Sequence, residues 1–469
     1  MYLALSTAWW KFFSNLNLEK VQNLFRDQLL NYFLRHTPRL LFRAAILLII
    51  STMTSFAEPN LWDVEWAKSA PLAVEVKSEA SETVEGRGLI LREIRYTSHE
   101  WKGEQIRIAG YLAMPETAKG TPLPGWLNVT GDMNAAKTAA AQYQVVALSI
   151  DRVGSGNSTG PRDHYLEWLA VEGEPRNGWM YHFVMAAIRG VTYLQTLPEV
   201  KPDAIGITGT SRGGICSLLA NAVDERIKLA VPIAATGDMV NTAEYAANWI
   251  ASIFLKEGQK TKDSEAFRVF HQYYDPLNSV HTSHGTVFLI NGAQDEFFPI
   301  TSTRHVFNRI GSDKRLEVIY DGDHGYYGNN ERLYDSYNNG IEVFRRLNGC
   351  VKKAVEHYLH GKGGMPQMPE VLMTEPDSSL GLSFAIQADE SDTIQNIRLL
   401  YSTDASYTYQ IKNVTVNGAR KVQISLKEGE AEKLVYFVEV EYMAGYYLTS
   451  VPHYAEGLAP KIRPAPSDE

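Results

Sequence analysis

The middle of the chain alternates short apolar runs with stretches of helical periodicity. Most runs precede a segment whose apolar residues recur three and four positions apart, as in an amphipathic helix. Apolar strands that alternate with helices predict βαβ units and a mostly parallel sheet with helices on both faces. The expected fold class is therefore α/β. The runs are Trp126–Thr130, Val145–Ile150, Ala204–Thr208, Leu229–Ile233, Val287–Asn291 and Leu316–Tyr320.

One further pattern precedes these runs, and another lies between two of them. Residues Leu89–Tyr96 and Ile106–Leu112 are β-rich and separated by a polar turn, which predicts an antiparallel pair at one edge of the sheet. Between about residues 239 and 278, helical patterning with many aromatic residues replaces the short return to the sheet. We expect a helical insertion there, which either roofs a pocket or only packs its helices together. The aromatic residues are Tyr245, Trp249, Phe254, Phe267, Phe270, Tyr273 and Tyr274.

The pattern changes after residue 360. Residues 361–379 are rich in glycine and proline at their start and are predicted to be a linker. Residues 380–456 then alternate apolar and polar positions in short runs separated by turns, which predicts a small β-sandwich. The Pro-rich end, 457–469, is expected to be a disordered tail. The runs are Leu382–Ile386, Ile397–Tyr401, Val414–Val416, Val422–Leu426 and Leu434–Tyr442.

The first 57 residues have the pattern of an export signal. An apolar stretch, Ala44–Ala57, follows several arginines and ends in Ser55-Phe56-Ala57, a small-x-small cleavage pattern. The stretch is short for the roughly 30 Å core of a bilayer, which favours cleavage over a permanent span. The mature chain would then begin at about Glu58, its catalytic domain would cover 58–360, and the protein would be periplasmic or secreted. The alternative is an uncleaved membrane anchor with the folded part outside the cytoplasm.

Composition removes several classes of function. The 469 residues are 45% apolar and 21% charged, as in a folded globular protein, and the net charge of −9 makes nucleic acid a poor partner. The two cysteines, Cys216 and Cys350, lack the spacing of a zinc or iron–sulfur site. A disulfide between them is left open.

The strongest chemical signal is a nucleophile elbow. The apolar run 204–208 leads into Gly209-Thr210-Ser211-Arg212-Gly213, and helical patterning starts directly afterwards. In a Gly-x-Ser-x-Gly turn the serine is held in a strained conformation, and the glycines allow the strand and helix to approach closely. Ser211 is the expected nucleophile, and an ordinary strand-to-helix turn is the alternative.

A serine nucleophile needs a base and an acid, which in this fold follow in the order Ser, acid, His. Asp295 follows the run 287–291, and His324 follows the run 316–320, so each lies just past a predicted strand. We therefore expect Ser211, His324 and Asp295 to form a triad, with Glu296 as the alternative acid. A helix-capping role for Asp295 or a surface position for His324 would contradict this.

The remaining site residues follow from the mechanism. Two backbone N–H groups should bind the oxyanion: that of Arg212, directly after the nucleophile, and one from the loop after 126–130, where we favour Asp132. Trp168 and Trp179, in the loop before the next helix, would either stack on a sugar or pack the loop down. No metal and no other cofactor is expected.

The span from about Leu89 to His357 resembles the α/β-hydrolase superfamily, especially its acetyl-xylan-esterase and dienelactone-hydrolase-like branch. The resemblance rests on the elbow and on three other stretches: Asp151-Arg152-Val153-Gly154-Ser155-Gly156-Asn157-Ser158, Tyr274-Asp275-Pro276, and Gly292-x-x-Asp295-x-x-x-Pro299. It implies metal-free hydrolysis of carboxylic esters, often small acyl groups on sugars. Thr130-Gly131-Asp132 departs from the usual His-Gly pair. A weaker similarity to the PhoPQ-activated pathogenicity-related proteins covers the acid loop and the C-terminal region.

Three functions are compatible with these observations. The first is an exported esterase that acts on a small-molecule or carbohydrate ester. The second is a serine peptidase of the prolyl-oligopeptidase type, although that group usually carries a propeller before the hydrolase and only about 30 residues separate Glu58 from the first predicted strand. The third is a catalytically silent hydrolase fold in which the β domain binds a partner.

Overall fold

The computed structural model describes residues 61–171, 173–245, 264–295, 297–320, 322–324, 336–374, 381–404 and 409–455. The chain divides into two compact units, Met1–Leu61 and Trp62–Glu469. The predicted export signal, the predicted tail and Glu296 lie outside the described residues. Within the described ranges, no helix combines the length and the apolar character needed to cross a membrane.

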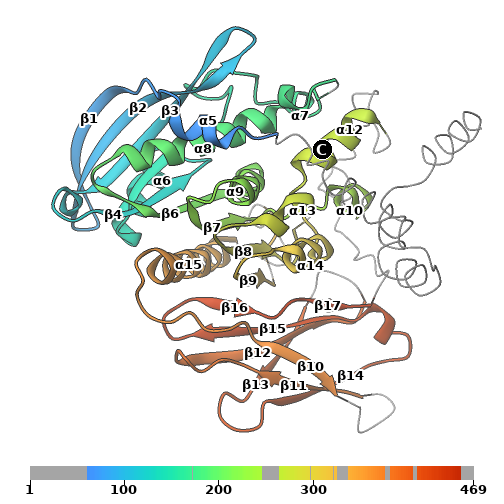
Figure 1. Cartoon of the computed structure of the whole chain (residues 1–469). Coiled ribbons are helices and arrows are strands. Elements are labelled where there is room, and N and C mark those ends of the chain that lie inside the picture. The colour runs from blue at the N-terminus through green and yellow to red at the C-terminus, as the bar shows by residue number, and fades with distance from the viewer. Residues whose placement is uncertain are drawn as a thin grey trace, which may run out of the picture. The chain divides into compact units, whose positions relative to one another are not determined.

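A nine-stranded sheet forms the centre of the second unit, in the order β1-β2-β3-β5-β4-β6-β7-β8-β9 (Figure 1). Strands β4 to β9 run parallel to one another, while β1, β2 and β3 form an antiparallel meander that pairs with β5 in the antiparallel sense. The predicted α/β class is confirmed. The strands are β1 (Glu75–Val84), β2 (Arg87–Trp101), β3 (Glu104–Pro115), β4 (Leu123–Asn128), β5 (Val146–Ile150), β6 (Val200–Thr210), β7 (Ile227–Ile233), β8 (Thr286–Gly292) and β9 (Lys314–Ile319).

The edge strand β1 has no counterpart in the sequence prediction. Nine of its ten residues are exposed and the tenth is half-buried, so no alternation of apolar and polar positions marks it. A turn at Glu85 and Gly86, both with positive φ, connects it to β2. Charged side chains on such an edge discourage pairing with a second chain, and they also remove the signal by which a strand is recognised.

Helices cover both faces of the sheet. Buried residues of α6 (Met133–Tyr143) and α15 (Ser336–Ala354) belong to one hydrophobic core, while α9 (Arg212–Val223) and α14 (Ile300–Arg309) contribute to another. The long helix α8 (Trp179–Thr196) packs against α9.

The described parts of the predicted insertion are helical. They are α10 (Met239–Tyr245), α12 (Glu265–Tyr274) and α13 (Pro276–Ser279). Trp249 and Phe254 lie outside the described residues.

The C-terminal region forms the predicted β-sandwich. One sheet has the order β10-β11-β14, and the other has the order β13-β12-β15-β16, with β17 paired to β15. Residues Glu370–Thr374, within the predicted linker, form β10 and pair with β11, so the sandwich begins earlier than expected. The remaining strands are β11 (Gly381–Gln387), β12 (Ile394–Ser402), β13 (Gln410–Val414), β14 (Lys421–Ser425), β15 (Val435–Tyr442), β16 (Tyr447–Thr449) and β17 (His453–Tyr454).

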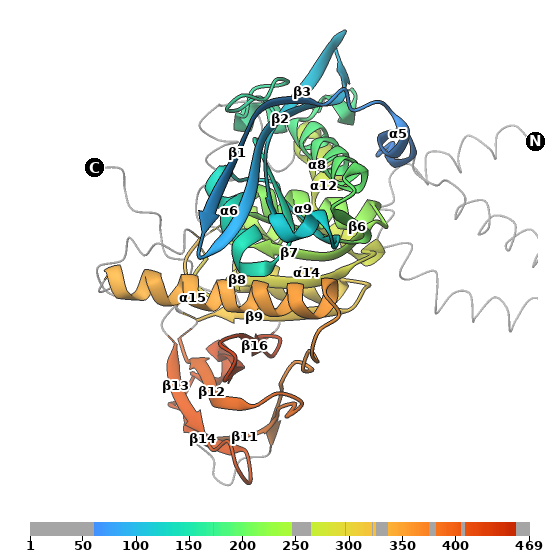
Figure 2. The same cartoon turned by 90° about the vertical axis from the view of Figure 1, so that its left-hand side faces the viewer.

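The sandwich packs directly on the edge of the large sheet. Figure 2 shows it beside β9 and α15. The backbone N–H of Val318 in β9 donates to Thr449 Oγ1 (3.1 Å). A Cβ on Gly349 of α15 would lie 1.9 Å from the carbonyl oxygen of Gly445, so glycine is required at this approach. The sandwich therefore covers a sheet edge that would otherwise be open.

Both cysteines are buried and free. Cys216 lies on α9 and Cys350 on α15, and no disulfide joins them.

Candidate active site

Ser211 lies at a sharp turn between β6 and α9. Its backbone has φ +57° and ψ −117°, an unfavourable conformation for a residue with a side chain. A Cβ on Gly209 would lie 2.6 Å from the backbone carbon of Gly213, and one on Gly213 would lie 2.6 Å from Thr130 Cγ2. Two glycines therefore make the turn sterically feasible, as the motif predicts.

His324 connects the serine to an acid. Its Nε2 lies 2.9 Å from Ser211 Oγ, and its Nδ1 lies 3.1 Å from each carboxylate oxygen of Asp295. An ionised carboxylate can only accept hydrogen bonds, so Nδ1 carries the proton and Nε2 is left to accept from the serine hydroxyl. The three residues come from loops after β6, β8 and β9, where the sequence places them.

Asp295 is held in place by its own loop. Its side chain is fully buried, and its Oδ1 accepts hydrogen bonds from the backbone N–H groups of Phe297 and Phe298, each at 2.8 Å. The ring of Phe297 packs edge-on against the His324 imidazole, with centroids 4.2 Å apart. These contacts fix both the carboxylate and the plane of the imidazole, while the His324 side chain keeps 12% of its surface exposed.

The two predicted oxyanion donors occupy the starts of two helices. Arg212 is the first residue of α9, where the N–H groups of the first turn have no partner within the helix. Asp132 is the N-cap of α6, and its side chain accepts from the backbone N–H of Ala135 (2.9 Å). The Asp132 carboxylate is thus engaged with the helix start.

Trp168 and Trp179 have the packing role rather than the sugar-stacking role. Trp179 is fully buried, Trp168 is 5% exposed, and their rings stack on each other with centroids 5.6 Å apart. Trp179 Nε1 donates to the carbonyl of Val153 (3.0 Å), and Trp168 stacks on Phe270 of α12. Rings covered by protein on this scale have no free face for a ligand, so the predicted substrate contact is wrong.

Sequence reasoning missed a charged group beside the elbow. The carboxylate of Asp163 accepts from Arg152 Nε (2.6 Å) and from Arg212 Nη1, although its own side chain is only 8% exposed. No local pattern marks Asp163, because its partners lie 11 and 49 residues away.

Within the described part of the chain, no three His, Cys, Asp or Glu side chains form a group that could hold a metal ion.

The chain is similar to several known proteins over part of its length. The model of the PhoPQ-activated pathogenicity-related protein family matches residues 165–344. The acetyl esterase Axe7A of Xylanibacter ruminicola is 26% identical over 155 residues, covering 32% of this chain and 33% of that protein. The uncharacterized peptidase YuxL of Bacillus subtilis is 24% identical over 251 residues, covering 50% of this chain and 35% of that protein.

The chain thus spans about a third of the length of these curated relatives. Among solved structures, acetyl xylan esterase 1 from a Thermoanaerobacterium species has a TM-score of 0.47 at 20% identity, covering 60% of this chain and 91% of that one. The chain's own features carry the assignment of the fold. The strand order is β3-β5-β4-β6, so β4 and β5 exchange places relative to the sequence. A strained serine lies at a strand-to-helix turn, and an acid and a histidine follow later strands. The chain therefore has the α/β-hydrolase fold.

Proposed function

We propose that the protein is a serine hydrolase that cleaves carboxylic esters with small acyl groups, including acyl groups on carbohydrates. The observation that carries the proposal is the 2.9 Å contact between Ser211 Oγ and His324 Nε2, with the buried Asp295 carboxylate behind the imidazole. A serine hydroxyl is a weak nucleophile unless a base removes its proton. This arrangement supplies such a base without a metal or an organic cofactor.

The reaction follows from the positions of these groups. Ser211 Oγ attacks the ester carbonyl while His324 Nε2 takes the hydroxyl proton, and the carbonyl oxygen becomes an oxyanion. The N–H groups of Arg212 and Asp132 bind that oxyanion. Collapse breaks the bond to the alcohol oxygen, which takes the proton from His324 and leaves an acyl-enzyme. Water then attacks the acyl carbon in the same way, releasing the acid and restoring Ser211.

The choice of an ester with a small acyl group rests on similarity. The chain is similar to proteins named acetyl esterase and acetyl xylan esterase, whose names supply both the acetyl group and the carbohydrate. It is also similar to a protein named as a peptidase. An ester and a peptide bond react through the same steps, so the test must compare both substrates.

Labelling of the full chain with a fluorophosphonate tests the proposal. We expect one label per molecule in the wild type, since the probe reacts only with an activated serine, and none in Ser211→Ala. The matched control is Ser312→Ala, because the Ser312 hydroxyl donates to the carbonyl of Gly285 (2.8 Å) and should leave labelling unchanged.

Enzyme that has not been treated with the probe is then compared on substrates. Acetyl nitrophenyl ester should be hydrolysed faster than longer-chain nitrophenyl esters, and loss of kcat in Ser211→Ala should reach about 10⁵- to 10⁶-fold. A folded wild type without labelling would contradict the hydrolase proposal. Cleavage of an unstructured peptide at a higher kcat/KM than the esters would replace the esterase with a peptidase.

A further inference from the structure

One carboxylate joins the nucleophile elbow to the loop that follows β5. Asp163 accepts from Arg152 Nε (2.6 Å) in that loop and from Arg212 Nη1 at the start of α9. Charge-assisted hydrogen bonds to a nearly buried carboxylate are stronger than exposed pairs, because water competes less for the groups. Asp163 is 8% exposed at its side chain, whereas Arg152 and Arg212 are 32% and 22% exposed.

The Arg212 guanidinium has further contacts with two aromatic side chains. Its central carbon lies 5.7 Å from the ring centroids of both Trp168 and Trp179. Trp179 in turn donates to the carbonyl of Val153, the residue after Arg152. The side chain of the residue after the nucleophile is therefore fixed by a carboxylate and by two stacked indoles.

We propose that Asp163 is a positioning residue for the hydrolysis reaction and that it acts through Arg212. This inference rests on the proposed function, in which the Arg212 N–H binds the oxyanion. Asp163 fixes the side chain of Arg212 against the loop that contains Arg152. The backbone N–H of Arg212 is thereby kept in one orientation beside Ser211. It does not touch the ester.

The effect of Asp163 should be on kcat rather than on KM. Oxyanion donors stabilise charge that develops only in the transition state, and they do so because they are already oriented. Without the Asp163 charge, Arg152 and Arg212 lose the carboxylate that they share, so the link between the loop and the elbow is weaker. A small acetyl ester in its ground state carries no such charge, so its KM should change little.

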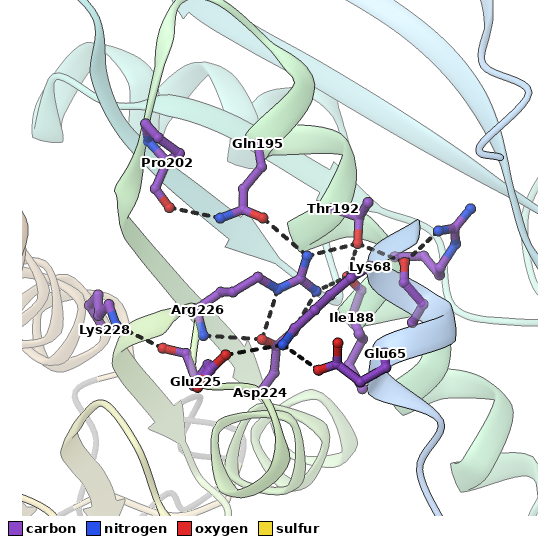
Figure 3. Close-up of polar contacts among 12 residues, drawn as sticks. Glu65, Lys68, Ile188, Thr192, Gln195, Pro202, Asp224, Glu225, Arg226 and Lys228 are labelled. Atoms are coloured by element: carbon purple, nitrogen blue, oxygen red, sulfur yellow. Dashed lines mark hydrogen bonds and ion pairs between the residues drawn. The ribbon is translucent and has the colours of Figure 1, made fainter. Parts of the chain in front are cut away.

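The other end of α9 offers a matched control. Asp224 is fully buried just after α9 and pairs with Arg226, whose Nη2 lies 2.6 Å from Asp224 Oδ2. Figure 3 shows this pair within the contacts that join Thr192 and Gln195 to the end of the helix. Asp224→Asn thus removes a buried Asp–Arg pair from the same helix, but at the end away from Ser211.

The experiment compares Asp163→Asn and Asp224→Asn in the full chain, with active sites titrated by fluorophosphonate. We expect Asp163→Asn to lower kcat on nitrophenyl acetate about tenfold, with KM within about twofold, and Asp163→Glu to recover part of the loss. Asp224→Asn should lower the Tm and leave kcat per titrated site unchanged. If Asp163→Asn does not fold, Arg212→Lys tests the same link, because it keeps the charge and the backbone N–H but loses the planar group.

Several outcomes would overturn the inference. An Asp163→Asn enzyme with wild-type kcat would show that the carboxylate is only structural, as would a lower Tm without a change in kcat. An equal loss of kcat in Asp224→Asn would show that any buried pair on α9 has the same effect. A wild type that neither takes up the label nor hydrolyses the ester would instead contradict the proposed function itself.

Discussion

Two groups of polar side chains lie along β9. Both contain acidic and basic residues, but the two groups have different roles. Just past its carboxyl end, His324 lies between Asp295 and Ser211 and keeps part of its surface exposed. Within the strand, Glu317 is fully buried and pairs with Arg346 of α15. Loops supply the first group, whereas a strand and a helix supply the core of the second.

The buried group reaches into the sandwich. Arg346 also pairs with Glu439 of β15, and Arg398 of β12 bridges Glu439 (2.5 Å) and Glu441 (2.7 Å). Burial raises the pKa of the Glu317 carboxyl, because removal from water opposes ionisation more than the nearby Arg346 favours it. Among the described residues, Glu317 Oε2 and Arg346 Nε have no hydrogen-bond partner.

The two groups differ in what their acidic and basic side chains do. In the loop group a proton can move, because the His324 side chain keeps 12% of its surface exposed and its Nε2 lies 2.9 Å from Ser211 Oγ. In the strand group the side chains are buried, and they join β9 and α15 to β12 and β15 of the sandwich. Buried pairs of this kind need not stabilise a fold overall, but loss of one partner is costly. We therefore expect the first group to control rate and the second to control stability.

The largest effect is expected at Asp295. Asp295→Asn keeps the shape of the side chain but removes the charge that holds the Nδ1 proton of His324, so kcat should fall about 10⁴-fold. The Tm should change little. Ester hydrolysis and thermal unfolding measured on one preparation check both expectations. A kcat loss below about tenfold would mean that another carboxylate supports His324.

The next largest effect is expected at Arg346. Arg346→Met leaves the carboxylates of Glu317 and Glu439 buried without their shared cation, which should cost about 3–5 kcal/mol of unfolding free energy. Urea unfolding measures this cost, while kcat below the transition should match the wild type. Lys352→Met is the matched control on α15, since its pair with Glu356 is exposed and should be worth below about 1 kcal/mol. Equal costs for the two variants would contradict the comparison.

A buried pair of histidines, His99 and His182, extends the comparison to the effect of pH on stability. His99 Nε2 lies 2.7 Å from His182 Nδ1, and desolvation lowers their pKa values to about 4 and about 3. The unfolded chain takes up these protons near pH 6.5, so it binds more protons than the folded chain between about pH 3 and 6.5. Stability should be complete above pH 6.5 and fall as the pH is lowered through that window.

Within this window, the free energy of unfolding should fall by up to about 1.4 kcal/mol per pH unit for each histidine. His182→Asn should reduce the slope of unfolding free energy against pH, whatever it does to the absolute stability. His281→Asn, at an exposed turn, should leave the slope unchanged. A slope that is identical in the wild type and His182→Asn would show that other groups cause the acid sensitivity.

The features that could be predicted from the sequence are those with a local signature. Six apolar runs marked the strands β4 to β9, and the glycines around Ser211 marked the elbow, because a strand-to-helix turn with a serine demands small neighbours. Asp295 and His324 followed from chain order, since the carboxyl ends of parallel strands meet at one edge of the sheet. In each case the determining physics acts within a few residues or within a repeated βα unit.

Other features were decided only by contacts between distant segments. The sandwich was predicted, but its packing on β9 was not, because Thr449 meets Val318 across 131 residues. Trp168 and Trp179 were compatible with either stacking on a sugar or packing, and only the positions of Phe270 and Arg212 settled their burial. No local sequence pattern indicates the link from Asp163 to Arg212, because the two residues are 49 positions apart. Local periodicity and turn chemistry thus determined the sheet and the candidate triad. Long-range packing decided what surrounds them, because burial and pairing depend on segments that meet only after folding.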